Sequence, residues 1–136
     1  MTAHSLKLKV ITFTLAGVSF ECQVKTWKMV NNSGDGERMY TFCVDGEFVE
    51  DTEPDYSLEL TFFSDWRSNG VSDFLVVNDL ATVAFVLDHH PDVALEHVRW
   101  SGSCKVKAPD VGGDVRTTEI TEAKMQCIGK PTYLHL

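Results

Sequence analysis

The chain has 136 residues, of which 43% are hydrophobic and 10% aromatic, and its formal net charge is −8. This composition predicts one folded domain over residues 1–136, and a net acidic chain with no basic patch is not suited to conventional DNA recognition. The chain has no apolar run as long as the about 18 to 20 residues needed to span a bilayer, and its first residues lack the pattern of a secretory signal. We therefore expect that it folds in a cytoplasm and does not insert into a membrane.

The first 29 residues have the pattern of two β-strands. We predict strands over residues 6–15 and 18–29, joined by a tight hairpin turn at Ala16-Gly17. The apolar positions of the second strand change parity near Lys25, which indicates either a β-bulge there or a far end that another element covers.

Residues 31–59 combine a turn signal, a short strand and an acidic segment. Small polar residues at 31–36 predict a loop, and the alternation of Tyr40, Phe42 and Val44 predicts a third strand. Residues 45–59 hold no Lys or Arg and seven of the acids: Asp45, Glu47, Glu50, Asp51, Glu53, Asp55 and Glu59. We interpret the part before residue 56 as a loop.

A helix interrupts the strand pattern once. Residues 56–63 alternate as a half-buried strand, and residues 81–87 return to this pattern. Between them we predict a helix over about residues 69–79, capped by Ser68 or Asn69. Its apolar face consists of Val71, Phe74 and Leu75 together with Asn78.

Two further strands complete the chain. Residues 98–106 place Val98, Trp100, Gly102, Cys104 and Val106 on one face, and residues 115–128 form the last long strand, which Gly129-Lys130-Pro131 ends. About seven strands and one helix predict a mainly β fold, an antiparallel sandwich or barrel with one flanking helix.

The chain carries no motif of a catalytic or cofactor site. A nucleophile elbow, a phosphate-binding glycine loop and a HExxH pair are absent. Residues 88–92 hold two adjacent histidines, but neighbours on a strand point to opposite faces, and a third ligand such as His97 would be needed, so a solvated loop is favoured over zinc. The acidic segment lacks the spacing of an EF-hand. We expect no enzyme, no metal and no cofactor.

Tryptophan and cysteine leave other possibilities. Trp27 or Trp66 could stack on a sugar, whereas Trp100 is in phase with a predicted core face. No two of the four cysteines have the spacing of a zinc knuckle or redox motif, and each lies in an apolar or alternating segment. We therefore expect buried free thiols rather than disulfides.

Five segments in order carry a family resemblance that spans about residues 6–131. They are LKLKVITFTLAGVSFECQVKTWKMV, YTFCVDGEF, SLELTFFSDWRSNGVSDFLVVND, TVAFVLD and APDVGGDVRTTEITEAKMQCIGKP. In these segments and their spacing the chain resembles the major tail proteins, or tail tube proteins, of long-tailed bacteriophages, particularly phages of actinobacteria. The position of the single helix, late after three or four strands and before the last ones, contributes most to the resemblance.

The resemblance implies a structural protein of the virion. It implies a β-sandwich with a flanking helix that forms hexameric rings with a continuous inner β-barrel, stacked into a hollow tube in the tail and assembled in the bacterial host cytoplasm. The partners would be copies of the chain and the tape measure, terminator and baseplate proteins, with double-stranded DNA passing through without specific binding. An acidic wall would let DNA slide, and the polar faces of the long strands are candidates for that wall.

Family members commonly use a long loop or hairpin after the first strands to reach the adjacent ring. Two segments are candidates for contacts between subunits or rings, residues 31–37 and 45–55. Their candidate residues are Asn31, Asn32, Asp35, Glu37, Glu47, Glu50, Asp51, Glu53 and Asp55. Alternatives are a β-sandwich module that binds carbohydrate, an enzyme or metal protein centred on residues 88–92, and a cap or baseplate component with the same fold.

Overall fold

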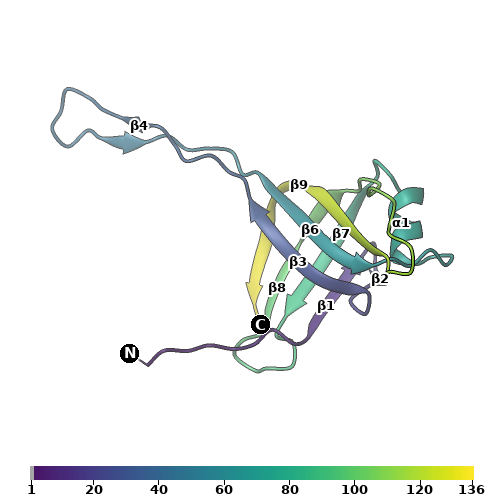
Figure 1. Ribbon diagram of the computed structural model, residues 1–136. Helices are drawn as coiled ribbons and strands as arrows, with labels where there is room; N and C mark the ends of the chain where they lie inside the picture. Colours follow the sequence, from purple (N-terminus) through teal and green to yellow (C-terminus); the bar gives the residue numbers. More distant parts are fainter. Residues whose placement is uncertain (1) are drawn as a thin grey trace.

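The computed structural model describes residues 2–136 and consists mainly of antiparallel β-strands (Figure 1). The elements in chain order are β1 (Ile11–Leu15), β2 (Val18–Ser19), β3 (Val24–Asn31), β4 (Arg38–Met39), β5 (Phe48–Val49), β6 (Tyr56–Phe63), α1 (Val71–Val77), β7 (Thr82–His89), β8 (Val98–Lys105) and β9 (Ile120–His135). Seven strands form one curled sheet in the order β2-β1-β7-β8-β9-β6-β3, and β4 pairs with β5 alone. The architecture is a half-barrel made from a single sheet, not a sandwich of two sheets.

The hydrophobic core lies inside the curl of the sheet, because alternate side chains along each strand point inward. Leu58 of β6 lies opposite Met125 of β9, and Leu60 lies opposite Ala123, so the inward positions of the two strands form continuous apolar rows. The largest fully buried side chains come from five strands, α1 and the segment after β8: Phe13, Leu15, Leu58, Leu60, Phe62, Val71, Leu75, Phe85, Leu87, Cys104, Val106 and Met125. The alternation predicted for residues 98–106 matches this arrangement.

Helix α1 is shorter than predicted and has a different N-cap. Asn69 has φ +67°, outside the conformation of an N-cap residue, and Gly70 takes that position. Glycine is required there because a Cβ at Gly70 would lie 2.6 Å from atoms of Asp65. The helix buries Val71 and Leu75, and its Phe74 packs on Phe20 with ring centroids 5.4 Å apart.

The two strands predicted before residue 30 form only in part. Residues 6–10 are extended but unpaired, and β1 starts at Ile11. The predicted tight turn is present, with positive φ at Ala16 and Gly17, but a turn at residues 21–23 separates β2 from β3. Within β3 the register against β6 shifts between Val24 and Thr26, which places a β-bulge at Lys25, one of the two alternatives that the change of parity left open.

Two other predicted strands have wrong boundaries. Residues 40–44 form no strand and lie in the tip of a hairpin. The last strand starts at Ile120 and continues past Gly129-Lys130-Pro131 to His135. Its register against β8 shifts between Ser101 and Ser103, so extra residues around Gly129, with φ +74°, are accommodated as a bulge without ending the strand.

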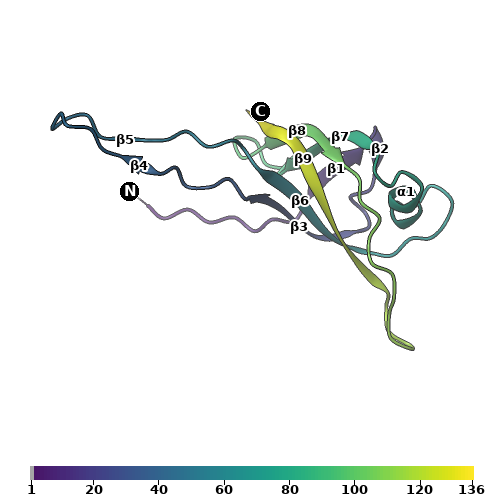
Figure 2. The ribbon, with the colours of Figure 1, turned by 90° about the horizontal axis from the view of Figure 1, so that it is seen from above.

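Residues 32–55 form an arm that extends far from the half-barrel (Figures 1 and 2). Its two limbs are joined by sparse hydrogen bonds, from the Glu50 amide to the Glu37 carbonyl (2.9 Å) and from the Thr52 hydroxyl to the Gly34 carbonyl (2.8 Å). Strands β4 and β5 pair at only two positions. A two-stranded ribbon is marginally stable without a layer to pack on, so the arm lacks the support that the body has.

Candidate functional site

The end of the arm exposes a cluster of large apolar side chains. Tyr40 is 74% exposed and Phe42 and Val44 are fully exposed, and the neighbouring Phe48 and Val49 are about half exposed. We call residues 38–49 the arm tip. Exposed apolar groups gathered at one projecting end are typical of a surface that another protein covers.

The arm also carries most of the net charge of the chain. Residues 32–55 hold eight acids and one basic residue, a net formal charge of −7 out of −8. The basic residue, Arg38, pairs with Glu47 at the arm tip. An apolar end on a strongly negative stem favours a partner that is both apolar and basic.

The structure brings the two predicted contact segments together as the outgoing and returning limbs of this one arm. Three of the nine candidate residues anchor its base: the Asn32 side chain donates to the Ser57 hydroxyl (3.1 Å), the Asn31 side chain accepts from the Ser33 amide (3.0 Å), and Asp55 accepts from Gln126. The other six are exposed along the limbs and the tip: Asp35, Glu37, Glu47, Glu50, Asp51 and Glu53.

The apolar arm tip was missed by sequence reasoning, which assigned residues 40–44 to a strand of the body. The signal that could have found it is the glycine and aspartate residues on both sides, at 34–36 and 45–46, because such residues favour turns that isolate a short hairpin.

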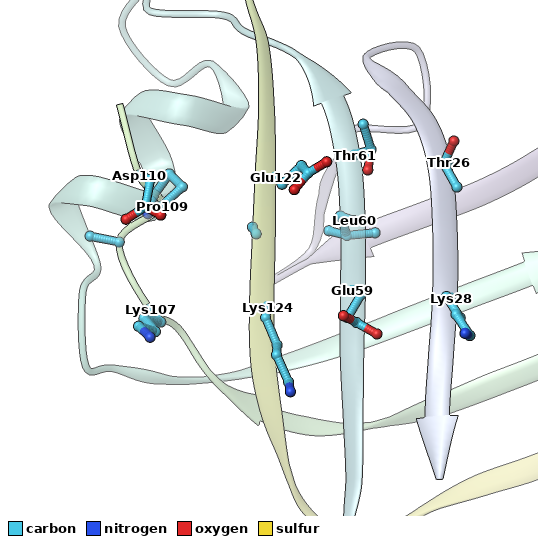
Figure 3. Close-up of a pocket in the computed structure, with 12 residues that line it drawn as sticks. Thr26, Lys28, Glu59, Leu60, Thr61, Lys107, Pro109, Asp110, Glu122 and Lys124 are labelled. Carbon is cyan, nitrogen blue, oxygen red and sulfur yellow. The ribbon is translucent and has the colours of Figure 1, made fainter. Parts of the chain in front are cut away.

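The polar face of the half-barrel has mixed charge. Across β3, β6 and β9 the residues Lys28, Glu59 and Lys124 lie side by side in register, and a second row holds Thr26, Thr61 and Glu122 (Figure 3). Together with residues 107–110 they line a hollow of about 460 Å³. Each acid on these strands has a lysine nearby in sequence or across the sheet, so this part of the polar face is not a uniformly acidic wall.

Residues 88–92 were expected to form a solvated loop, but Asp88 and His89 belong to β7. The buried Asp88 carboxylate accepts two hydrogen bonds from Arg99 (2.8 and 3.0 Å), and His97 Nε2 lies 3.0 Å away. The Arg99 guanidinium, with His97, holds the pKa of Asp88 below its usual value. The carboxylate is thus fully occupied by partners within the fold.

His89 points toward the core face between two tryptophans. Trp100 Nε1 donates to His89 Nε2 (3.3 Å), and the Trp27 ring lies 5.6 Å from the His89 ring. Burial lowers the pKa of His89, and the neighbouring His90 lowers it further. Within residues 2–136 no three His, Cys, Asp or Glu side chains are grouped so that they could hold a metal ion.

The tryptophans do not form a common platform. Trp27 and Trp100 are partly buried and both contact His89, and Trp100 also packs on Tyr133 with ring centroids 5.0 Å apart. Trp66 is exposed, and its Nε1 donates to Glu119 (3.0 Å) in the segment before β9.

All four cysteines are free thiols, as expected, but only two are buried. Cys104 and Cys127 lie opposite each other in the core, whereas Cys22 and Cys43 are exposed, which contradicts the expectation of burial for all four. The exposure of Cys22 follows from the turn at residues 21–23, and that of Cys43 from its place in the arm tip.

Alkylation should separate the two pairs of thiols. Burial raises the pKa of Cys104 to about 12 and also raises that of Cys127, so the reactive thiolate is scarce at both. We expect iodoacetamide at neutral pH to modify Cys22 and Cys43 in the native protein and all four residues after denaturation, as mapped by peptide mass spectrometry. Rapid native labelling of Cys104 would contradict the structure.

Replacing Asp88 by Asn should destabilise the half-barrel by about 1–3 kcal/mol. It should also make the free energy of unfolding depend less steeply on pH in the acidic range. The folded-state pKa of Asp88 is lowered, so its contribution is present above the unfolded value of about 4 and is lost as pH falls through the folded value. Urea unfolding across acidic pH measures this, with Asp92→Asn on the exposed turn as the control. An unchanged pH slope in Asp88→Asn would rule out this role.

The comparisons with known proteins assign no family. No protein-family model matches the chain, and no curated protein matches it. None of the helices within residues 2–136 has the length and apolar character needed to cross a bilayer.

Proposed function

We propose that the chain is a structural subunit of the tail tube of a long-tailed bacteriophage, which assembles into hexameric rings stacked into a tube that conducts viral DNA. The observation that supports this most is the acidic arm with an uncovered apolar tip, projecting from a compact half-barrel. A side chain such as Phe42, fully exposed in the single chain, is stabilised by a partner that removes it from water.

The edges of the sheet support assembly by strand pairing. Strand β3 is eight residues long, pairs with β6 on one side, and has no strand partner on the other side among residues 2–136. Unpaired edges of this length are usually shielded, because they offer free amide and carbonyl groups to other strands. In a ring, the edge strand of one subunit would pair with its neighbour and close a continuous barrel.

The charge distribution is compatible with passage of DNA. The chain is net negative, and the polar face of β3, β6 and β9 alternates acids with lysines, so it offers no continuous basic track that would hold phosphates. Under this proposal the further partners are the tape measure, terminator and baseplate proteins, and the site of action is the virion tail.

Electron microscopy of the purified protein over a series of concentrations tests the proposal. We expect hexameric rings and tubes of uniform diameter, with a matching increase in sedimentation coefficient. Rings that never stack would instead indicate a cap or baseplate component. A monomer at every concentration that binds glycans through Trp66 would favour the carbohydrate-binding alternative, and a clean monomer without ligand would also refute the tube.

A further inference from the structure

Two segments have the sequence pattern of a strand and yet lie unpaired in the single chain. Residues 6–10 place Leu6, Leu8 and Val10 on one side, each 42–47% exposed, and residues 40–44 place Tyr40, Phe42 and Val44 at alternate positions. Strand formation needs a partner for backbone amide and carbonyl groups, and within residues 2–136 neither segment is part of a strand pair. Residues 8–10 line a hollow with β3 without pairing with it, and residues 42–45 form the turn at the arm tip. Both are therefore candidates for pairing with another molecule.

The two segments have opposite charge. Residues 2–10 contain Lys7 and Lys9 and no acid, whereas the arm has a net charge of −7. The lysines alternate with the apolar residues, so an extended segment presents one basic and one apolar side. The arm tip offers both complements, exposed aromatic and aliphatic side chains together with Glu47 and the nearby Glu50.

The geometry favours pairing between copies over pairing within one chain. The N-terminal segment and the arm leave the half-barrel toward the same general side but run apart (Figure 1). The base of the arm is tied to the body by the Asn32–Ser57 hydrogen bond and by the Asn32 amide, which donates to the Asp55 carbonyl (2.6 Å). The N-terminal segment is tied near its start by His4 and Glu96, 2.7 Å apart.

We propose that residues 6–10 of one copy add as a β-strand to the arm tip of a second copy. Leu6, Leu8 and Val10 pack against the exposed apolar side chains of the tip, while Lys7 and Lys9 lie near its acids. Main-chain hydrogen bonds provide the pairing and the alternating side chains provide the register. The inference deepens the proposed function, on which it rests for its biological setting, by naming the partner of the arm.

Cysteine cross-linking tests the contact directly, because Cys43 already lies in the arm tip. In a Cys22→Ser background, Leu8→Cys should give an intermolecular disulfide with Cys43 on mild oxidation, identified by mass spectrometry of the linked peptides. The further change Cys43→Ser should abolish that product. Val111→Cys, in an exposed loop, is the matched control and should not link efficiently to Cys43.

A charge swap tests the same contact by a second route. Lys7→Glu with Lys9→Glu should weaken self-association about tenfold or more, since two favourable pairs become repulsive. Adding Glu47→Lys and Glu50→Lys should restore most of that loss. The control, Lys105→Glu with Lys107→Glu, makes the same charge change on exposed residues of the body and should not be rescued by the arm changes.

The outcomes separate this inference from the proposed function. Tubes that form without a link between position 8 and Cys43, and without rescue in the charge swap, overturn the strand pairing and leave the tube intact. A specific link and rescue in oligomers that never form rings or tubes support the pairing and refute the tube. A protein that stays monomeric, without links at any concentration, overturns both.

Discussion

Replacing Tyr40, Phe42 and Val44 by serine is expected to abolish self-association while the half-barrel stays folded. All three side chains are exposed in the single chain, so their loss removes nothing from the core. If a partner buries them, each contributes about 1.5–3 kcal/mol to association. The triple variant should therefore weaken association at least about a thousandfold, as measured by sedimentation and electron microscopy.

The matched control for this variant changes three exposed apolar residues outside the arm. Leu95, Val111 and Val115 lie on loops of the half-barrel, and their replacement by serine also removes three exposed apolar side chains. This control should associate like the unaltered protein. Equal association of the arm variant and the control would contradict the role of the tip, and a large fall in the melting temperature of the arm variant would show that the tip supports the fold instead.

Phe62→Ala should have the largest effect on stability. Phe62 is fully buried inside the curl of the sheet, and removing a buried phenyl ring typically costs about 3–5 kcal/mol through lost transfer energy and the cavity that remains. This is a large part of the total of about 5–15 kcal/mol for a domain. The urea concentration at the midpoint of unfolding should fall sharply, while the slope of the free energy of unfolding against urea concentration stays constant.

The neighbouring Phe63 provides the control for this substitution. It is on the same strand, points to the opposite face and is 41% exposed, so Phe63→Ala should cost about 1 kcal/mol or less. If both variants lost the same stability, the assignment of the inner and outer faces of β6 would be wrong.

The inner and outer faces of several strands were predictable because one-sided burial imposes a period of two. The alternation in residues 56–63 and 98–106 indicates which side chains enter the core, and the structure buries Leu58, Leu60 and Cys104 as expected. The bulge at Lys25 leaves a change of parity in the sequence. That change predicted either a β-bulge or a far end of the strand covered by another element.

Other features depend on partners far along the chain. The last strand reaches His135 because β8 lies beside it and a bulge absorbs the residues around Gly129. Asp88 is buried because Arg99, eleven residues later, returns beside it on the next strand. Neither relation has a local sequence signal, which explains why the strand was ended too early and Asp88 was assigned to a solvated loop.

The residues of the candidate site were predicted from the sequence, but their arrangement as one projecting arm was not. Small polar residues and acids indicated two loops, and the structure joins them as limbs of one arm. The alternation of Tyr40, Phe42 and Val44 shows that one side of this segment is apolar, but it does not show whether the covering element belongs to the same molecule. The strand prediction assumed that it did.

The acids of the arm have a consequence for separate copies of the chain in solution. An apolar hairpin end with unpaired edges is prone to stick to identical ends, and such contacts lead to aggregates. Arms that each carry a net charge of −7 repel one another at short range, and acids beside an aggregation-prone segment act as gatekeepers. The charges that favour a basic segment at the tip therefore also oppose contact between two arm tips.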